Sequence, residues 1–176
     1  MRDLGLLAAR AVVGGYVAAH GAQKLFGVLG GHGLEGTAKM FDSLGLTPGR
    51  EMAALAGGAE FGGGILTATG IASPLGPVAV AGAMTVATGV HRKSGPFAMS
   101  GGYELPLTNL AVAVALALAG PGRLRMGPKL SFKLTTLTLL GAGALTGVAL
   151  QKLLNHRPEL APAVDVETAA PATTEA

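Results

Sequence analysis

Long apolar segments alternate along this chain with short stretches rich in Gly, Pro, Ser and charged residues. A helix needs roughly 20 apolar residues to cross the hydrocarbon core of a bilayer, and shorter apolar helices fit by local thinning. A shorter pattern over residues 36–44 predicts an amphipathic helix at the membrane interface. The sequence thus predicts an all-α fold, a transmembrane helical bundle. The predicted spans cover about residues 4–26, 47–71, 75–90, 104–119 and 134–154.

Local signals mark the ends of these helices. The Thr-Pro pair at 47–48 places an N-cap and a first-turn proline before the second span. The Gly-Pro-Gly at 120–122 ends the fourth span. The Gly-rich second span includes Gly58 and Gly62 as a small-xxx-small pair, which predicts that this helix packs tightly at its centre. The tail over residues 158–176 has too little apolar bulk to fold and is predicted to be disordered.

The composition supports the membrane interpretation. Charged residues make up 13% of the chain, against about 25% in soluble domains. The alternative, a soluble buried helical bundle, would require solvating several nearly uncharged segments. The first span is too long for the apolar core of a secretory signal and ends in Gln23 and Lys24, so we expect a retained helix. Because there is no cysteine, disulfides, thiolate metal sites and cysteine nucleophiles are excluded.

A net charge of +3 is compatible with binding to nucleic acid. However, the basic residues are scattered between apolar segments and form no basic stripe. We therefore expect the lipid bilayer, and no nucleic acid, as a partner. One loop carries a dense basic cluster, which favours a cytoplasmic N-terminus by the positive-inside rule. This cluster consists of Arg123, Arg125, Lys129 and Lys133.

Ionisable residues inside the predicted spans are the main sign of a functional site. Arg10, His20 and Lys24 lie in the first span, and Glu60 lies in the middle of the second. A charged group in hydrocarbon costs roughly 2.5–3.5 kcal/mol on insertion scales, so such groups are usually paired or line a cavity. The rise per residue of a helix gives the depth of each residue in the membrane. Glu60 and Arg10 lie at similar depths if the second span starts at the membrane surface. If the second span starts outside the membrane, His20 is nearer to Glu60, and both pairings stay open.

Further polar residues gather at the membrane face where the first span ends. The candidate pocket comprises Arg10, His20, Gln23, Lys24, Glu60, His91, Tyr103 and Glu104. Most of them have a structural alternative. Lys24 snorkels to the headgroups, Arg10 and Glu60 staple two helices together, and Tyr103 belongs to an aromatic belt. His20 is then a structural histidine with satisfied hydrogen bonds, and His91 is an interface residue. No helix carries a paired ligand spacing such as Glu-x-x-His, so we expect no metal site.

Several separated motifs occur in order along the chain. They are His20-Gly-Ala-Gln-Lys-Leu-Phe-Gly27, Gly36-Thr-Ala, Ser43-Leu-Gly-Leu46, Glu60 in its Gly-rich helix, Gly101-Gly-Tyr-Glu-Leu-Pro-Leu107 and Gly120-Pro-Gly-Arg123. Together they resemble the DoxX family of small bacterial membrane proteins. The resemblance covers about residues 1–126 and implies a four-helix core in the bacterial plasma membrane, crossed several times. Outside the resemblance, residues 127–157 are predicted to form a basic loop and a fifth C-terminal span, and the tail follows.

The resemblance implies a redox context. Relatives include a subunit of an archaeal thiosulfate:quinone oxidoreductase and a mycobacterial protein linked to a membrane oxidoreductase complex. Family membership does not establish chemistry, so three hypotheses stay open. In the first hypothesis, the chain is a redox-linked subunit, at most part of an enzyme. Its pocket binds quinone, and it has no intrinsic cofactor. In the second, it anchors soluble oxidoreductase partners at the membrane. The third and least favoured is a small-molecule transporter, which formation of a homo-oligomer would favour.

Overall fold

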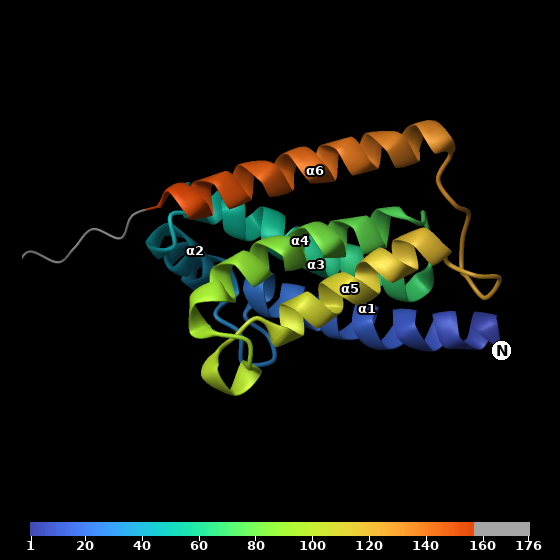
Figure 1. Ribbon diagram of the computed structural model, residues 1–176, viewed down its shortest axis with the longest axis horizontal. Coiled ribbons are helices and arrows are strands. Elements are labelled where there is room, and N and C mark those ends of the chain that lie inside the picture. Colours follow the sequence, from blue (N-terminus) through green and yellow to red (C-terminus); the bar gives the residue numbers. More distant parts are fainter. Residues whose placement is uncertain (157–176) are drawn as a thin grey trace, which may run out of the picture.

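The computed structural model describes residues 1–156, and this part of the chain consists of helices and loops (Figure 1). The predicted all-α fold is confirmed, and every predicted helix is present with ends close to those expected. The predicted disorder of the tail concerns residues outside the described part. The helices are α1 (Arg2–Phe26), α2 (Gly33–Ser43), α3 (Gly49–Thr69), α4 (Leu75–His91), the short 3-10 turns η1 (Arg92–Ser94) and η2 (Ala98–Ser100), α5 (Glu104–Ala119) and α6 (Phe132–Asn155).

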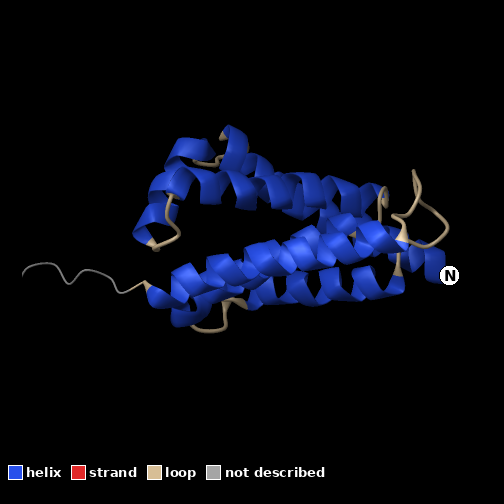
Figure 2. Cartoon of the chain, turned by 90° about the horizontal axis from the view of Figure 1, so that it is seen from above, coloured by secondary structure: helices blue, strands red, loops and turns tan. Residues whose placement is uncertain are grey.

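The five longer helices run along the long axis of the molecule, and the short α2 lies at one end (Figure 1). α1 packs on α3, α3 packs on α4, and α4 packs on both α5 and α6. Seen from above, the helices form elongated layers (Figure 2). The N-terminus lies at the end opposite to α2 (Figure 1). Among the described helices, α6 makes extensive contact only with α4. α6 therefore stands beside α3 without packing along it.

Glycines on facing helices hold α1 and α3 close together. A Cβ atom added to Gly14 would lie 2.6 Å from the carbonyl oxygen of Gly64, and one added to Gly21 would lie 2.7 Å from that of Gly57. The two backbones therefore touch at two points seven residues apart on each helix. α3 therefore packs tightly, as predicted, but through Gly57 and Gly64. Gly58 and Gly62 do not make this contact, because a Cβ at either position would meet no atom within 4 Å.

The start of α3 differs slightly from its prediction. The helix begins at Gly49 rather than at Pro48, and the side chain of Thr47 does not act as the N-cap. Instead, Oδ1 of Asp42 accepts a hydrogen bond of 2.7 Å from the amide of Gly49. A carboxylate from the end of α2 thus satisfies one of the free amides of the first turn of α3. The prediction failed because this cap comes from another helix rather than from the preceding residue.

Large apolar side chains cover the outer faces of the helices. α1 and α6 are each long and apolar enough to cross a membrane, and α5 is a shorter apolar helix. α6 exposes apolar side chains such as Leu137, Leu140 and Leu154. A soluble protein rarely leaves so much apolar surface in contact with water, whereas a bilayer solvates it. The chain is therefore built as a helical membrane protein.

Candidate functional site

An ion pair joins α1 to α3 in the interior of the bundle. Nζ of Lys24 donates a hydrogen bond to Oε2 of Glu60. The Lys24 side chain is 26% exposed and that of Glu60 only 4%. Pairing of Glu60 with Arg10 or His20, as considered from the sequence, is wrong.

Close approach of the two helices explains why Lys24 is the partner. The absent side chain of Gly57 leaves room for α1, since a Cβ there would lie 3.4 Å from Cβ of Lys24 and 2.7 Å from Cδ2 of Leu25. Glu60 follows Gly57 by three residues, and residues three apart share a face of a helix. The flexible Lys24 side chain therefore reaches along α3 to the carboxylate. The depth of each residue in the membrane could not identify Lys24 as the partner of Glu60, because the relative position of α1 and α3 depends on which glycines touch.

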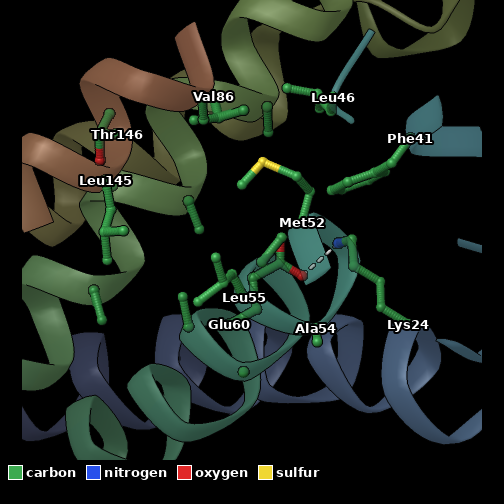
Figure 3. A pocket seen from close by; sticks show the side chains of 18 of the residues that line it. Lys24, Phe41, Leu46, Met52, Ala54, Leu55, Glu60, Val86, Leu145 and Thr146 are labelled. Atoms are coloured by element: carbon green, nitrogen blue, oxygen red, sulfur yellow. Dashed lines mark hydrogen bonds and ion pairs between the residues drawn. The ribbon is translucent and has the colours of Figure 1, made fainter. Parts of the chain in front are cut away.

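The ion pair lies in the wall of a cavity of about 550 Å³. α3, α4 and α6 form its sides, α2 closes one end, and α1 contributes only Lys24. Figure 3 shows Met52 and Phe41 above the Lys24–Glu60 pair, with Leu145 and Thr146 of α6 across the cavity. Most of the lining is apolar and small, and it includes Leu55, Ala56, Gly58, Ala59, Ala79, Gly82, Ala83, Val86, Ala87, Ala142 and Ala149.

Three ionisable residues face this apolar cavity: Lys24, Glu60 and His91. No described residue donates a hydrogen bond to Oε1 of Glu60, and the Lys24 ammonium has three N–H groups, of which the carboxylate takes one. Nδ1 of His91 lies 2.7 Å from the carbonyl oxygen of Gly101 and must donate to it, because a carbonyl only accepts. Nε2 is therefore left for other contacts. The cavity thus offers both donors and acceptors to a bound molecule.

Arg10 lies at the opposite end of the bundle and is almost fully buried. Its guanidinium donates hydrogen bonds to the carbonyl oxygens of Pro121 (2.6 Å) and Leu124. These carbonyls belong to the loop between α5 and α6, so Arg10 ties that loop to α1. The arrangement is a structural clasp, and Arg10 is not among the residues that line the cavity.

The remaining candidates lie at the same end as Lys24 but outside the cavity lining. Nδ1 of His20 is 3.0 Å from Oε1 of Gln23, whose amide nitrogen donates to the carbonyl oxygen of Leu29. These contacts tie the end of α1 to the following loop. Tyr103 and Glu104 begin α5, where their amides bond to the carbonyl oxygens of the preceding loop. A role for these four residues in binding stays a prediction that the cavity geometry does not support.

The apolar side of the site was not predicted from the sequence. Phe41, Leu46 and Met52 enclose the ion pair, and α6 supplies a whole wall. A signal existed for α6, because its lining residues at 138, 142, 145 and 149 follow the spacing of a single helix face. That face could not be distinguished from a lipid-facing one by composition. In residues 1–156, no group of three or more His, Asp and Glu side chains comes together to hold a metal ion.

The apolar outer faces and the buried ion pair define a helical membrane protein with an internal cavity. The family model for DoxX matches residues 5–92, which is half of the chain, and the chain belongs to the DoxX family. The matched region contains most of α1 and all of α2, α3 and α4, whereas α5 and α6 lie beyond it. Comparisons with curated proteins and with solved structures returned no match.

Proposed function

We propose that this chain is a multi-pass protein of the bacterial plasma membrane and a redox-linked subunit whose cavity binds the headgroup of a quinone. The observation that carries the proposal is the Lys24–Glu60 pair in the wall of an otherwise apolar cavity. Ionisable residues at membrane depth are expensive and usually mark a substrate or proton pathway. Apolar residues of similar size could hold two helices together at no greater cost, so stability alone does not account for the pair.

The charge balance of the cavity favours a neutral headgroup. The charges of Lys24 and Glu60 offset one another, and the side chains around them are mostly apolar. An anionic lipid or fatty acid would have to displace the Glu60 carboxylate from Lys24. A quinone carries two carbonyl oxygens and no charge, so it fits beside the intact pair. The cavity volume of about 550 Å³ also falls within the range of small-molecule sites, roughly 300–1,000 Å³.

The same residues suit both redox forms of such a ligand. Reduction of a quinone to a quinol adds two electrons and two protons, and the protons end on the two oxygens. A free N–H group of Lys24 donates to a quinone oxygen, and Oε1 of Glu60 accepts from a quinol hydroxyl. In the direction of reduction, Lys24 gives up the protons that the two quinone oxygens take up. Nε2 of His91, at the end of α4, takes up protons from the aqueous side and returns them to the cavity to replace those lost from Lys24. In this proposal the electrons come from a partner oxidoreductase.

A second candidate function is a membrane anchor for soluble oxidoreductases. The loop between α4 and α5 supports it, because Phe97 and Met99 are exposed there and Arg92 and Lys93 lie beside them on the chain. This loop is at the same end of the bundle as His91 (Figure 1). A partner bound there would lie close to the proposed proton exit, so the anchor and redox functions are compatible.

The test is purification from native membranes in mild detergent, with quinone content and co-purifying proteins measured together. We expect the wild-type protein to carry quinone and the double variant Lys24→Met/Glu60→Gln to lose it while staying folded. Arg50→Gln is the control, because Arg50 pairs with Glu35 on the exposed surface. Equal quinone content in all three proteins, or none in the wild type, would overturn the quinone proposal. Soluble oxidoreductases without quinone would favour the anchor.

A further inference from the structure

The cavity is elongated along α4, and its length exceeds that of a quinone headgroup. Its lining residues on α4 run from Leu75 to His91 at spacings of three and four, so they form a single stripe along the whole helix. Sixteen helical steps correspond to about 24 Å. The members between these ends are Ala79, Gly82, Ala83, Val86, Ala87 and Val90.

α6 provides a second wall that runs parallel to this stripe. Thr138, Ala142 and Leu145 face the cavity, as do residues further along α6. The two helices touch at Gly82, where a Cβ atom would lie 2.8 Å from Oγ1 of Thr146. Because α6 makes extensive contact with α4 but not with α3, the cavity is a slot between α3 and α6 with α4 at its back.

The ionisable groups are confined to one half of this slot, and the hydroxyl of Thr146 lies at its middle, level with Gly82. Lys24, Glu60 and His91 lie between the middle of the slot and its α2 end. The other half, toward the start of α4, is lined by apolar and small residues and by Thr138, whose hydroxyl already donates to the carbonyl oxygen of Leu134. That half therefore has no unsatisfied hydrogen-bonding group for a polar ligand, and it suits a hydrocarbon chain.

We infer that the slot binds a long-tailed isoprenoid amphiphile lengthwise, with its head beside Lys24 and Glu60 and its tail beneath α6 toward the start of α4. The identity of the head and the isoprenoid chemistry of the tail rest on the proposed function, whereas the position of the tail rests on the lining alone. The tail leaves the slot sideways into the lipid, between α3 and α6. Such a site lets a membrane-dissolved ligand enter without crossing water.

Two alanines of α6 allow a matched test. Ala142 lines the tail half of the slot, whereas Ala144 is exposed and lies outside the lining. Ala142→Phe would fill the tail half and leave the head half open, and Ala144→Phe would only extend into lipid. Three probes are compared in one detergent by equilibrium gel filtration: a tailless naphthoquinone, the same ring with an isoprenoid tail, and an isoprenoid alcohol of equal length.

We expect Ala142→Phe to weaken binding of the tailed quinone by at least about tenfold and to leave the tailless quinone unchanged. Ala144→Phe should bind both quinones as the wild type does. If Ala142→Phe weakened neither quinone, or both equally, the inferred tail position would be overturned while the quinone proposal stood. If the wild type bound the isoprenoid alcohol but neither quinone, and Ala142→Phe abolished that binding, the tail position would stand and the quinone proposal would fail.

Discussion

Lys24 near the end of α1 and Glu60 in the middle of α3 form an ion pair in the wall of an apolar cavity. The two helices approach so closely because glycines face each other at two points along their length. The pair is therefore a consequence of backbone packing. Among residues 1–156, no side chain other than Lys24 donates a hydrogen bond to the Glu60 carboxylate.

Loss of Lys24 alone should destabilise the protein more than loss of both partners. Lys24→Met leaves the Glu60 carboxylate buried without a cation, and breaking a buried pair in this way costs about 3 kcal/mol. Lys24→Met/Glu60→Gln removes both charges and should recover most of that loss. The measurement is the midpoint of thermal unfolding in detergent, followed by circular dichroism. Arg50→Gln, which removes an exposed pair, should leave the midpoint unchanged. A Lys24→Met midpoint equal to that of the wild type would show that the pair does not hold α1 to α3.

Glycine positions on α1 should differ sharply in their tolerance of alanine. At Gly21, a Cβ atom would overlap the backbone of α3, including the amide of Phe61. At Gly15 no atom lies within 4 Å. Gly21→Ala should therefore cost about 1–3 kcal/mol through separation of the two helices, whereas Gly15→Ala should be neutral or slightly stabilising. The folded yield and unfolding midpoint in detergent measure both. Equal midpoints for the two variants would contradict the close packing of α1 on α3.

Arg10 should protect the loop between α5 and α6 from proteolysis. Arg10→Gln removes the guanidinium that donates to the carbonyl oxygens of Pro121 and Leu124, and a Lys at this position could not reproduce the forked geometry. Trypsin cleavage after Arg123 and Arg125 should become faster in the variant.

The loop between α4 and α5 supplies the internal control for this experiment. Cleavage after Arg92 and Lys93 should keep its wild-type rate, because these residues lie at the other end of the bundle (Figure 1). Mass spectrometry of the early fragments separates the two sites. An unchanged rate after Arg123, or equal acceleration at both ends, would argue against a local clasp.

The helices could be predicted from the sequence because their determinants are local. Apolar runs of sufficient length and strong stop signals define them, and α5 has the expected bounds from Glu104 to Ala119. The start of α3 was predicted less well, because Asp42 caps it from another helix. Local patterns therefore specify helices well, and they specify helix ends only where the cap lies next to the helix in the chain.

The candidate site was harder to predict, for reasons of geometry. Arg10, His20 and Lys24 share the first span, and which of them meets Glu60 depends on how far α1 slides along α3. The contacts of Gly57 and Gly64 with α1 fix that position, and the sequence does not reveal which glycines touch. The same limit applies to α6, whose cavity-facing side has the same kinds of residue as its lipid-facing side.

Two glycines of α3 allow a direct test of whether the cavity beside Lys24 and Glu60 binds a quinone. Gly58 lines the cavity and Gly62 does not, and a Cβ at either position has open space. Gly58→Phe should therefore fill the cavity without disturbing the fold, and Gly62→Phe is its matched control.

The quantity to measure is the amount of quinone bound per folded protein after purification from the same membranes. We expect quinone in the wild type and in Gly62→Phe, and its loss from Gly58→Phe at an unchanged unfolding midpoint. Undiminished quinone in a folded Gly58→Phe protein would show that the quinone does not bind in this cavity.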